Sequence, residues 1–125
     1  MREQVHLSEL QIAIMRTLWG RGEASVADVA AELLAERSLA HTTVATLLTR
    51  LEKRGVVAHR RDGRQLVYRA LVSEDAVRTS MVADLLETLF QGDAKALVAH
   101  LVREDELAAG DLAKLRAKLK AAKRD

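Results

Sequence analysis

The sequence predicts a mainly α-helical protein with one small β-hairpin, arranged as three helices, the hairpin and three further helices. Three observations support this fold class. The 125-residue chain is rich in alanine and leucine and contains no proline, a composition that favours helices. Apolar residues recur at helical spacing in six segments. One Asp-Gly pair stands between two runs that are compatible with β-strands, which is a strong hairpin signal.

The first two helices are marked by their N-terminal caps. Ser8 and Gln11 form a capping box, in which each side chain bonds to the backbone N–H of the other residue, and Gly20 is expected to end this helix. Ser25 caps the second helix, with Asp28 in its first turn, where the helix dipole favours a negative charge. Both segments carry an apolar stripe that predicts packing on a common core.

The third helix is expected over residues 40–54 and is closed by Gly55. A helical wheel gathers its apolar residues on one face, namely Val44, Leu47, Leu48 and Leu51. The opposite face and its flanks carry short side chains and cations: Thr42, Thr43, Ala45, Thr46, Thr49, Arg50 and Lys53. Short groups can approach base edges in a DNA major groove while cations meet phosphate. Alternatively, the threonine hydroxyls bond back to the preceding turn.

The hairpin is expected from two runs, 56–61 and 65–70, with Asp62 and Gly63 as turn residues that both need a positive φ. The pattern does not decide which face of each strand is buried. The tip brings together three guanidinium groups, which suit contact with phosphate or the minor groove: Arg60, Arg61 and Arg64. A loop tip that is charged only because it lies in water is the alternative.

Positive charge is concentrated in residues 50–69, which hold seven Lys and Arg against two acidic residues, although the whole chain has a net charge of only +2. Such a block is a candidate footprint for a polyanion, or else a solvated charged surface. Three helices followed by a basic hairpin form the layout of a winged helix-turn-helix DNA-binding domain. We therefore expect such a domain over residues 1–72.

Residues 73–125 are expected to form a helical dimerisation domain. Ser73 caps a long helix that ends at about Phe90, and Asp93 begins the next one. A segment this small buries too little surface to be stable alone, so we expect its core to be completed by a second copy. The candidate dimer-core residues are Val77, Met81, Leu85, Leu89, Phe90, Leu97, Leu101, Leu112, Leu115 and Leu119. Packing of these residues on their own winged helix is the alternative.

Several other classes of protein are not expected. The absence of cysteine excludes disulfides, a thiolate nucleophile and Cys-ligated metal sites. The four histidines are scattered without metal-ligand spacing, and the chain has no phosphate-binding loop or catalytic motif, which predicts no enzyme activity, metal or cofactor. No apolar run is long enough to enter a membrane, and the N-terminus lacks a signal-peptide core, which predicts a cytoplasmic protein.

Residues 41–55 (HTTVATLLTRLEKRG), followed by Asp62-Gly63-Arg64 and Tyr68, resemble the penicillinase-repressor (BlaI/MecI) family, and the similarity runs essentially end to end. The resemblance implies a winged helix that reads a palindromic operator in double-stranded DNA. It also implies a helical half that pairs two subunits, giving a homodimeric transcriptional repressor. By matching position, it places Thr42, Thr43, Thr46 and Arg50 on the recognition helix, and Arg61 and Arg64 on the wing.

The sequence departs from the family in two ways that concern regulation. Copper-responsive relatives carry a C-terminal cysteine cluster, which this chain lacks. Antibiotic-responsive members act with a membrane sensor protease system and are inactivated by cleavage of an Asn-Phe bond, and His100-Leu101 stands at that position here. The competing interpretation is a winged helix that serves as a protein–protein interaction module, which would need neither the basic block nor the threonine face.

Overall fold

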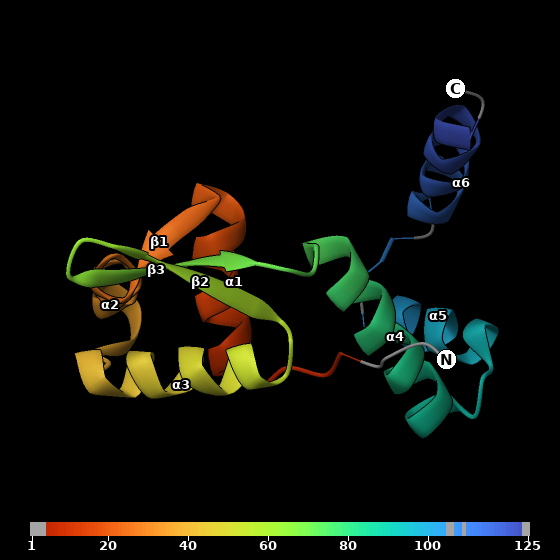
Figure 1. Cartoon of the computed structure of the whole chain (residues 1–125). Helices are drawn as coiled ribbons and strands as arrows, with labels where there is room; N and C mark the ends of the chain where they lie inside the picture. Colours follow the sequence, from red (N-terminus) through yellow and green to blue (C-terminus); the bar gives the residue numbers. More distant parts are fainter. Residues whose placement is uncertain (1–4, 105–106, 109, 124–125) are drawn as a thin grey trace. The chain divides into compact units, whose positions relative to one another are not determined.

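The computed structural model describes residues 5–104, 107–108 and 110–123, and the chain divides into two compact units, Met1–Met81 and Val82–Asp125 (Figure 1). The predicted order of helices around a hairpin is confirmed, with one short strand added. The elements are α1 (Glu9–Arg21), β1 (Glu23–Ser25), α2 (Val26–Arg37), α3 (His41–Lys53), β2 (Val57–Asp62), β3 (Gln65–Ala70), α4 (Glu74–Phe90), α5 (Ala94–Arg103) and α6 (Asp111–Lys123). Among the described residues, none of these helices has the length and apolarity needed to cross a membrane.

The sheet of the N-terminal unit has three antiparallel strands in the order β1-β3-β2. In Figure 1 it runs above α3, which lies along the lower edge of this unit. The strand β1 was not predicted from the sequence, because three residues are too few to show a strand periodicity. This strand pairs Glu23 with Arg69 and Ser25 with Val67, and it makes β3 the central strand.

The hairpin forms as predicted, but its turn is shifted by one residue. Asp62 still pairs with Gln65, so the two turn residues are Gly63 and Arg64. Only Gly63 has a positive φ, of 63°. The expectation that Asp62 also needs a positive φ is therefore wrong, and glycine at the first turn position is typical of a type II′ turn.

The helix starts follow the predicted caps, whereas one helix end does not. Ser8 with Gln11, and Ser25 with Asp28, form complete capping boxes. The first helix continues through Gly20, because an interior glycine costs only about 1 kcal/mol relative to alanine. It ends instead at Gly22, whose φ of 84° favours glycine.

The core of the N-terminal unit receives side chains from all of its elements. On α3 the predicted inner face is confirmed: Val44, Leu48 and Leu51 are fully buried, and Leu47 packs against them. The first turns of α4 also join this core, since Val77 is only 4% exposed and Met81 packs beside it. Val77 and Met81 therefore pack on their own winged helix, which is the alternative to dimerisation that the sequence left open. The boundary between the two units lies after Met81, nine residues beyond the boundary at 72–73 that the sequence predicts.

The C-terminal unit comprises the end of α4 together with α5 and α6, and it has little interior of its own. Asp93 caps α5 as expected, by accepting a hydrogen bond from the Ala96 N–H. No residue of α5 is fully buried. Leucines of α4 and α6 lie exposed, up to 64% for Leu89 and 63% for Leu119. The apolar stripes predicted for this region are therefore largely uncovered within the single chain.

Candidate nucleic-acid interface

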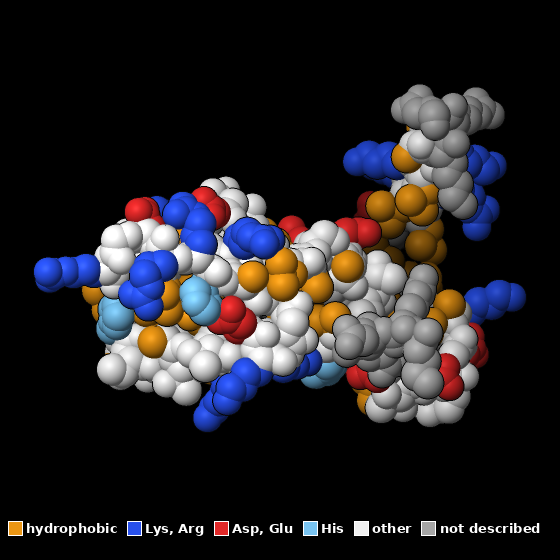
Figure 2. Space-filling view, in the orientation of Figure 1, with side chains coloured by type: hydrophobic (Ala, Val, Ile, Leu, Met, Phe, Trp, Pro, Cys, Tyr) orange, Lys and Arg blue, Asp and Glu red, His pale blue; other side chains and the backbone are white. Residues whose placement is uncertain are grey.

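The outer face of α3 is open to solvent. Its residues Thr42, Thr43, Thr46, Thr49, Arg50 and Lys53 are exposed, and Ala45 is half-buried. In Figure 2 the lower edge of the N-terminal unit, over α3, is largely white, the colour of uncharged polar side chains and backbone, with blue cations projecting from it. The residues that the sequence placed on this face lie together on α3, and Thr49 at its edge also interacts with Tyr68 of β3.

Two of the threonines do bond back to their own helix. The Thr46 hydroxyl donates to the Thr42 carbonyl at 2.9 Å, and the Thr49 hydroxyl donates to the Ala45 carbonyl at 2.9 Å. Each bond uses the hydroxyl hydrogen but leaves the oxygen lone pairs available. Thr46 can therefore accept a hydrogen bond from an amino group of a base, whereas the Thr49 hydroxyl also interacts with the Tyr68 hydroxyl of β3. Within the residues that the structure describes, the hydroxyls of Thr42 and Thr43 form no hydrogen bond, so they can donate as well as accept.

The strand register separates the cations of the hairpin onto two faces. Successive side chains of a strand point to opposite faces, so Arg61 shares a face with His59, and Arg60 lies on the other. His59 contacts Glu52 of α3, which shows that the face of His59 and Arg61 is the one turned toward α3. On the opposite face, Arg60 donates to both carboxylate oxygens of Glu23, at 2.9 and 3.1 Å.

This ion pair distinguishes Arg60 from the other predicted DNA contacts. The hydrogen bond from Arg60 holds the pKa of Glu23 below its usual value, and the same bond raises the pKa of Arg60. Across the described part of the chain, the remaining candidate cations form no ion pair: Arg50, Lys53, Arg61 and Arg64. Four cations are thus available for phosphate, and the fifth already has a carboxylate partner.

Two contacts tie the hairpin and the N-terminal segment to α3, and the sequence analysis assigned neither. His59 Nδ1 lies 2.6 and 2.8 Å from the Glu52 carboxylate oxygens, and its ring centroid lies 5.5 Å from that of Tyr68. Arg54, which the sequence counted in the basic block, donates to the His6 carbonyl at 2.8 Å. Both contacts depend on tertiary pairing, and no local pattern indicates them.

Comparison with known proteins agrees with this geometry. Residues 7–121 match the family model described as penicillinase repressor. The chain belongs to the penicillinase repressor family. Curated relatives include the penicillinase repressor of Staphylococcus aureus, 25% identical over 91% of this chain and 90% of that protein. Another is the transcriptional regulator BlaI of Mycobacterium tuberculosis, 35% identical over 82% of this chain and 75% of that protein.

Solved structures extend the likeness to the winged helix. The solution structure of the DNA-binding domain of the repressor BlaI has a TM-score of 0.53 at 26% identity, covering 61% of this chain and 93% of that chain. Monomeric Bacillus licheniformis BlaI, solved in complex with the blaP half-operator, has a TM-score of 0.52 at 26% identity and the same coverage. As a member of this family the chain is a DNA-binding transcriptional repressor, and the family consists of repressors, not of enzymes.

Proposed function

We propose that this penicillinase-repressor family member binds a two-fold symmetric DNA operator as a homodimer, with the outer face of α3 from each subunit in a major groove. The observation that carries the proposal is the composition of that face. Short, exposed polar side chains are flanked by Arg50 and Lys53, which form no ion pair with any residue that the structure describes. The structure of monomeric Bacillus licheniformis BlaI in complex with a half-operator, whose fold resembles this one, supports binding of one N-terminal unit to each half of an operator.

The threonines of α3 differ in the hydrogen bonds that they can offer to bases. Thr42 and Thr43, near the start of α3, have hydroxyls that can both donate and accept, so they can bond to base edges that present either a donor or an acceptor. Thr46, whose hydroxyl hydrogen is used within the helix, acts as an acceptor, which suits the amino groups of adenine or cytosine, and Thr49 lies at the edge of the face beside Tyr68. Ala45 offers a small apolar surface to a thymine methyl group.

The cations position the protein on the backbone of the DNA. Arg50 and Lys53 meet phosphates beside the groove, and Arg61 and Arg64 meet phosphates or the minor groove under the wing. Arg61 lies on the sheet face turned toward α3, so it approaches the same duplex. Arg60 does not belong to this set, because Glu23 occupies its guanidinium on the opposite face.

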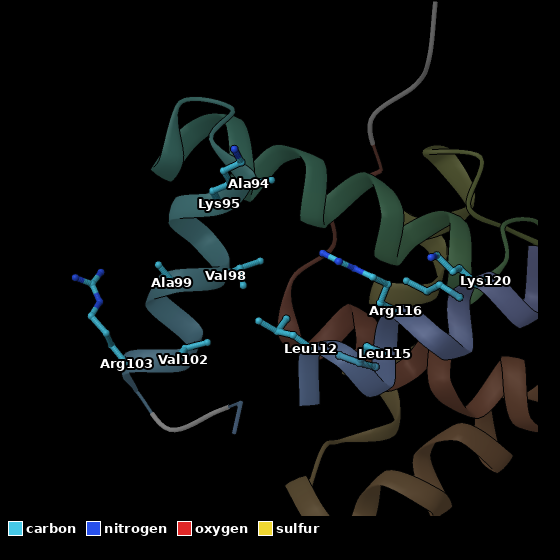
Figure 3. A pocket seen from close by; sticks show the side chains of 11 residues that line it. Ala94, Lys95, Val98, Ala99, Val102, Arg103, Leu112, Leu115, Arg116 and Lys120 are labelled. Atoms are coloured by element: carbon cyan, nitrogen blue, oxygen red, sulfur yellow. The ribbon is translucent and has the colours of Figure 1, made fainter. Parts of the chain in front are cut away.

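Dimerisation is assigned to the C-terminal unit because its apolar surface is uncovered. Between α5 and α6 lies a groove of about 950 Å³, into which Val98, Leu112 and Leu115 face (Figure 3). Four cations line its rim, namely Lys95, Arg103, Arg116 and Lys120. A second copy would cover the exposed leucines, and the proposed interface is formed by Leu85, Leu89, Phe90, Leu97, Leu101, Leu112, Leu115 and Leu119. Val77 and Met81 are left out, since they pack in the N-terminal core.

Induction by proteolysis is the second part of the proposal. The His100–Leu101 bond lies inside α5, with His100 exposed and Leu101 half-buried. A protease binds an extended chain, so α5 must open locally before a membrane sensor protease system could cut this bond. Cleavage there would separate α6 from the rest of the proposed interface and release the repressor from DNA. A repressor with this role acts in the cytoplasm.

Selection of bound duplexes from a random pool tests the proposed function. The expected product is an inverted repeat whose half-sites lie about 10 or about 20 bp apart, one or two helical turns. Sedimentation of the protein alone should show a dimer. Enrichment of no common sequence would instead favour the winged helix as a protein–protein interaction module, and enrichment of a single half-site by a monomer would refute the homodimer.

A further inference from the structure

The first turns of α4 are fixed to the DNA-binding unit by two hydrogen bonds as well as by packing. The indole N–H of Trp19, on α1, donates to the Val72 carbonyl at 2.9 Å, just before α4 begins. The Val5 N–H donates to the hydroxyl of Ser80, in the second turn of α4, at 2.8 Å. Both bonds are partly buried. The buried Val77 lies between Val72 and Ser80 in the sequence.

The segment that reaches Ser80 also reaches the end of α3. Arg54, the C-cap residue of α3, donates to the carbonyl of His6, and Leu7 is 1% exposed in the core. Three consecutive residues, 5 to 7, therefore connect the end of the proposed recognition helix to the second turn of α4. Removing the Ser80 hydroxyl would leave the half-buried Val5 N–H without its partner in this connection.

The helix that carries Ser80 also carries part of the proposed dimer interface. From Glu74 to Phe90, α4 runs without interruption, and Leu85 and Leu89 follow Ser80 along it. Backbone hydrogen bonds join each turn of an α-helix to the next, so the turn that carries Ser80 is linked directly to the turns that carry Leu85 and Leu89. In a two-fold dimer, the separation of the two recognition helices sets the separation of the half-sites that can be bound together.

We propose that Trp19 and Ser80 are positioning residues that set the half-site spacing of the operator. Through their hydrogen bonds they hold α4 in one orientation on the DNA-binding unit, and the dimer then accepts one separation of half-sites over its neighbours. Both residues act through α4 without touching DNA. This inference rests on the proposed homodimer, and it concerns the choice between operators that contain identical half-sites.

The test uses the full-length protein and a series of inverted-repeat duplexes whose half-site separation differs from the selected optimum by one or two base pairs. Wild type should prefer the optimum clearly over its neighbours. In Ser80→Ala and in Trp19→Phe, that preference should fall about fivefold for each hydrogen bond lost, or about 25-fold in the dimer, which loses one bond in each subunit. Affinity for a duplex with a single half-site should not change, because the face of α3 is intact.

Two further variants separate positioning from a general loss of structure. Thr79→Ala removes a neighbouring exposed hydroxyl of α4 and should keep the wild-type preference. Ser80→Thr keeps the hydroxyl acceptor and should restore the preference lost in Ser80→Ala. The inference is overturned if Ser80→Ala and Trp19→Phe keep the wild-type preference, or if single half-site affinity falls in parallel with it. If the wild-type protein is monomeric, or does not bind inverted repeats more tightly than other duplexes, the proposed function on which this inference rests is refuted instead.

Discussion

Replacing Arg61 by alanine should flatten the salt dependence of operator binding, whereas replacing Arg60 should leave it unchanged. The two arginines are neighbours on β2 and carry the same charge, so they form a matched pair. Arg61 lies on the sheet face turned toward α3 and has no ion-pair partner among the described residues. Arg60 lies on the other face, where both oxygens of the Glu23 carboxylate accept its hydrogen bonds.

The magnitude follows from counting phosphate contacts. Four contacts in each subunit, from Arg50, Lys53, Arg61 and Arg64, give a dimer a slope of about −7 in log K against log salt concentration. Loss of Arg61 from both subunits removes two contacts and reduces the slope to about −5. Between 50 and 200 mM salt, the Arg61→Ala variant should therefore lose about tenfold less affinity than wild type.

Fluorescence anisotropy of a labelled operator, titrated at several salt concentrations, measures these slopes directly. A random duplex of the same length should show the same flattening, since phosphate contacts carry no sequence information. If Arg60→Ala flattens the slope as much as Arg61→Ala, the assignment of the two side chains to opposite functional faces is wrong. A change in sequence preference at an unchanged slope would show that Arg61 reads bases.

Three other changes test separate parts of the account. Thr46→Ala should lower the preference for the operator over a mismatched duplex by about 1–3 kcal/mol per lost base contact, and Thr46→Ser, which keeps the acceptor, should retain it. Leu85→Asp should give a monomer in sedimentation, whereas Ala83→Asp adds the same charge at an exposed position on the opposite face of α4 and should leave the dimer intact. Burial, with the nearby Glu52 charge, raises the pKa of Tyr68 above 10.0, so the free energy of unfolding should fall as pH rises from 10.0 through that higher pKa. Tyr68→Phe should remove this alkaline loss, measured by urea unfolding at each pH.

The parts of the fold that depend on neighbouring residues were predictable from the sequence. Capping boxes mark the starts of α1 and α2, because a cap and its partner lie three residues apart. The two faces of α3 follow from its helical period, and the hairpin follows from one Asp-Gly pair. The threonine face of α3 therefore depends only on the local helical period and needs no tertiary contact to be predicted.

The parts that were missed depend on pairing between distant segments. The strand β1 is too short to show a period, yet it brings Glu23 beside β3 and within reach of Arg60, which lies 37 residues further along the chain. Without β1, the arginines of the hairpin look equivalent. Val77 and Leu85 share one apolar stripe of α4, and only the packing shows that the first is buried and the second exposed. Periodicity identifies an apolar face, but it does not identify what covers that face.

This difference in packing has a consequence for how repression can be reversed. The N-terminal unit has a complete core that includes Val77, so the winged helix should stay folded when the C-terminal unit is damaged. The C-terminal unit has no fully buried residue in α5, and in the proposed homodimer the second subunit would cover its apolar surface. Linking two half-site contacts raises the affinity of a dimer by about 10²–10⁴-fold over that of one module. If the protein binds its operator as the proposed homodimer, loss of the dimer alone should be enough to free the operator, and a single cut in α5 should achieve it without unfolding the recognition helix.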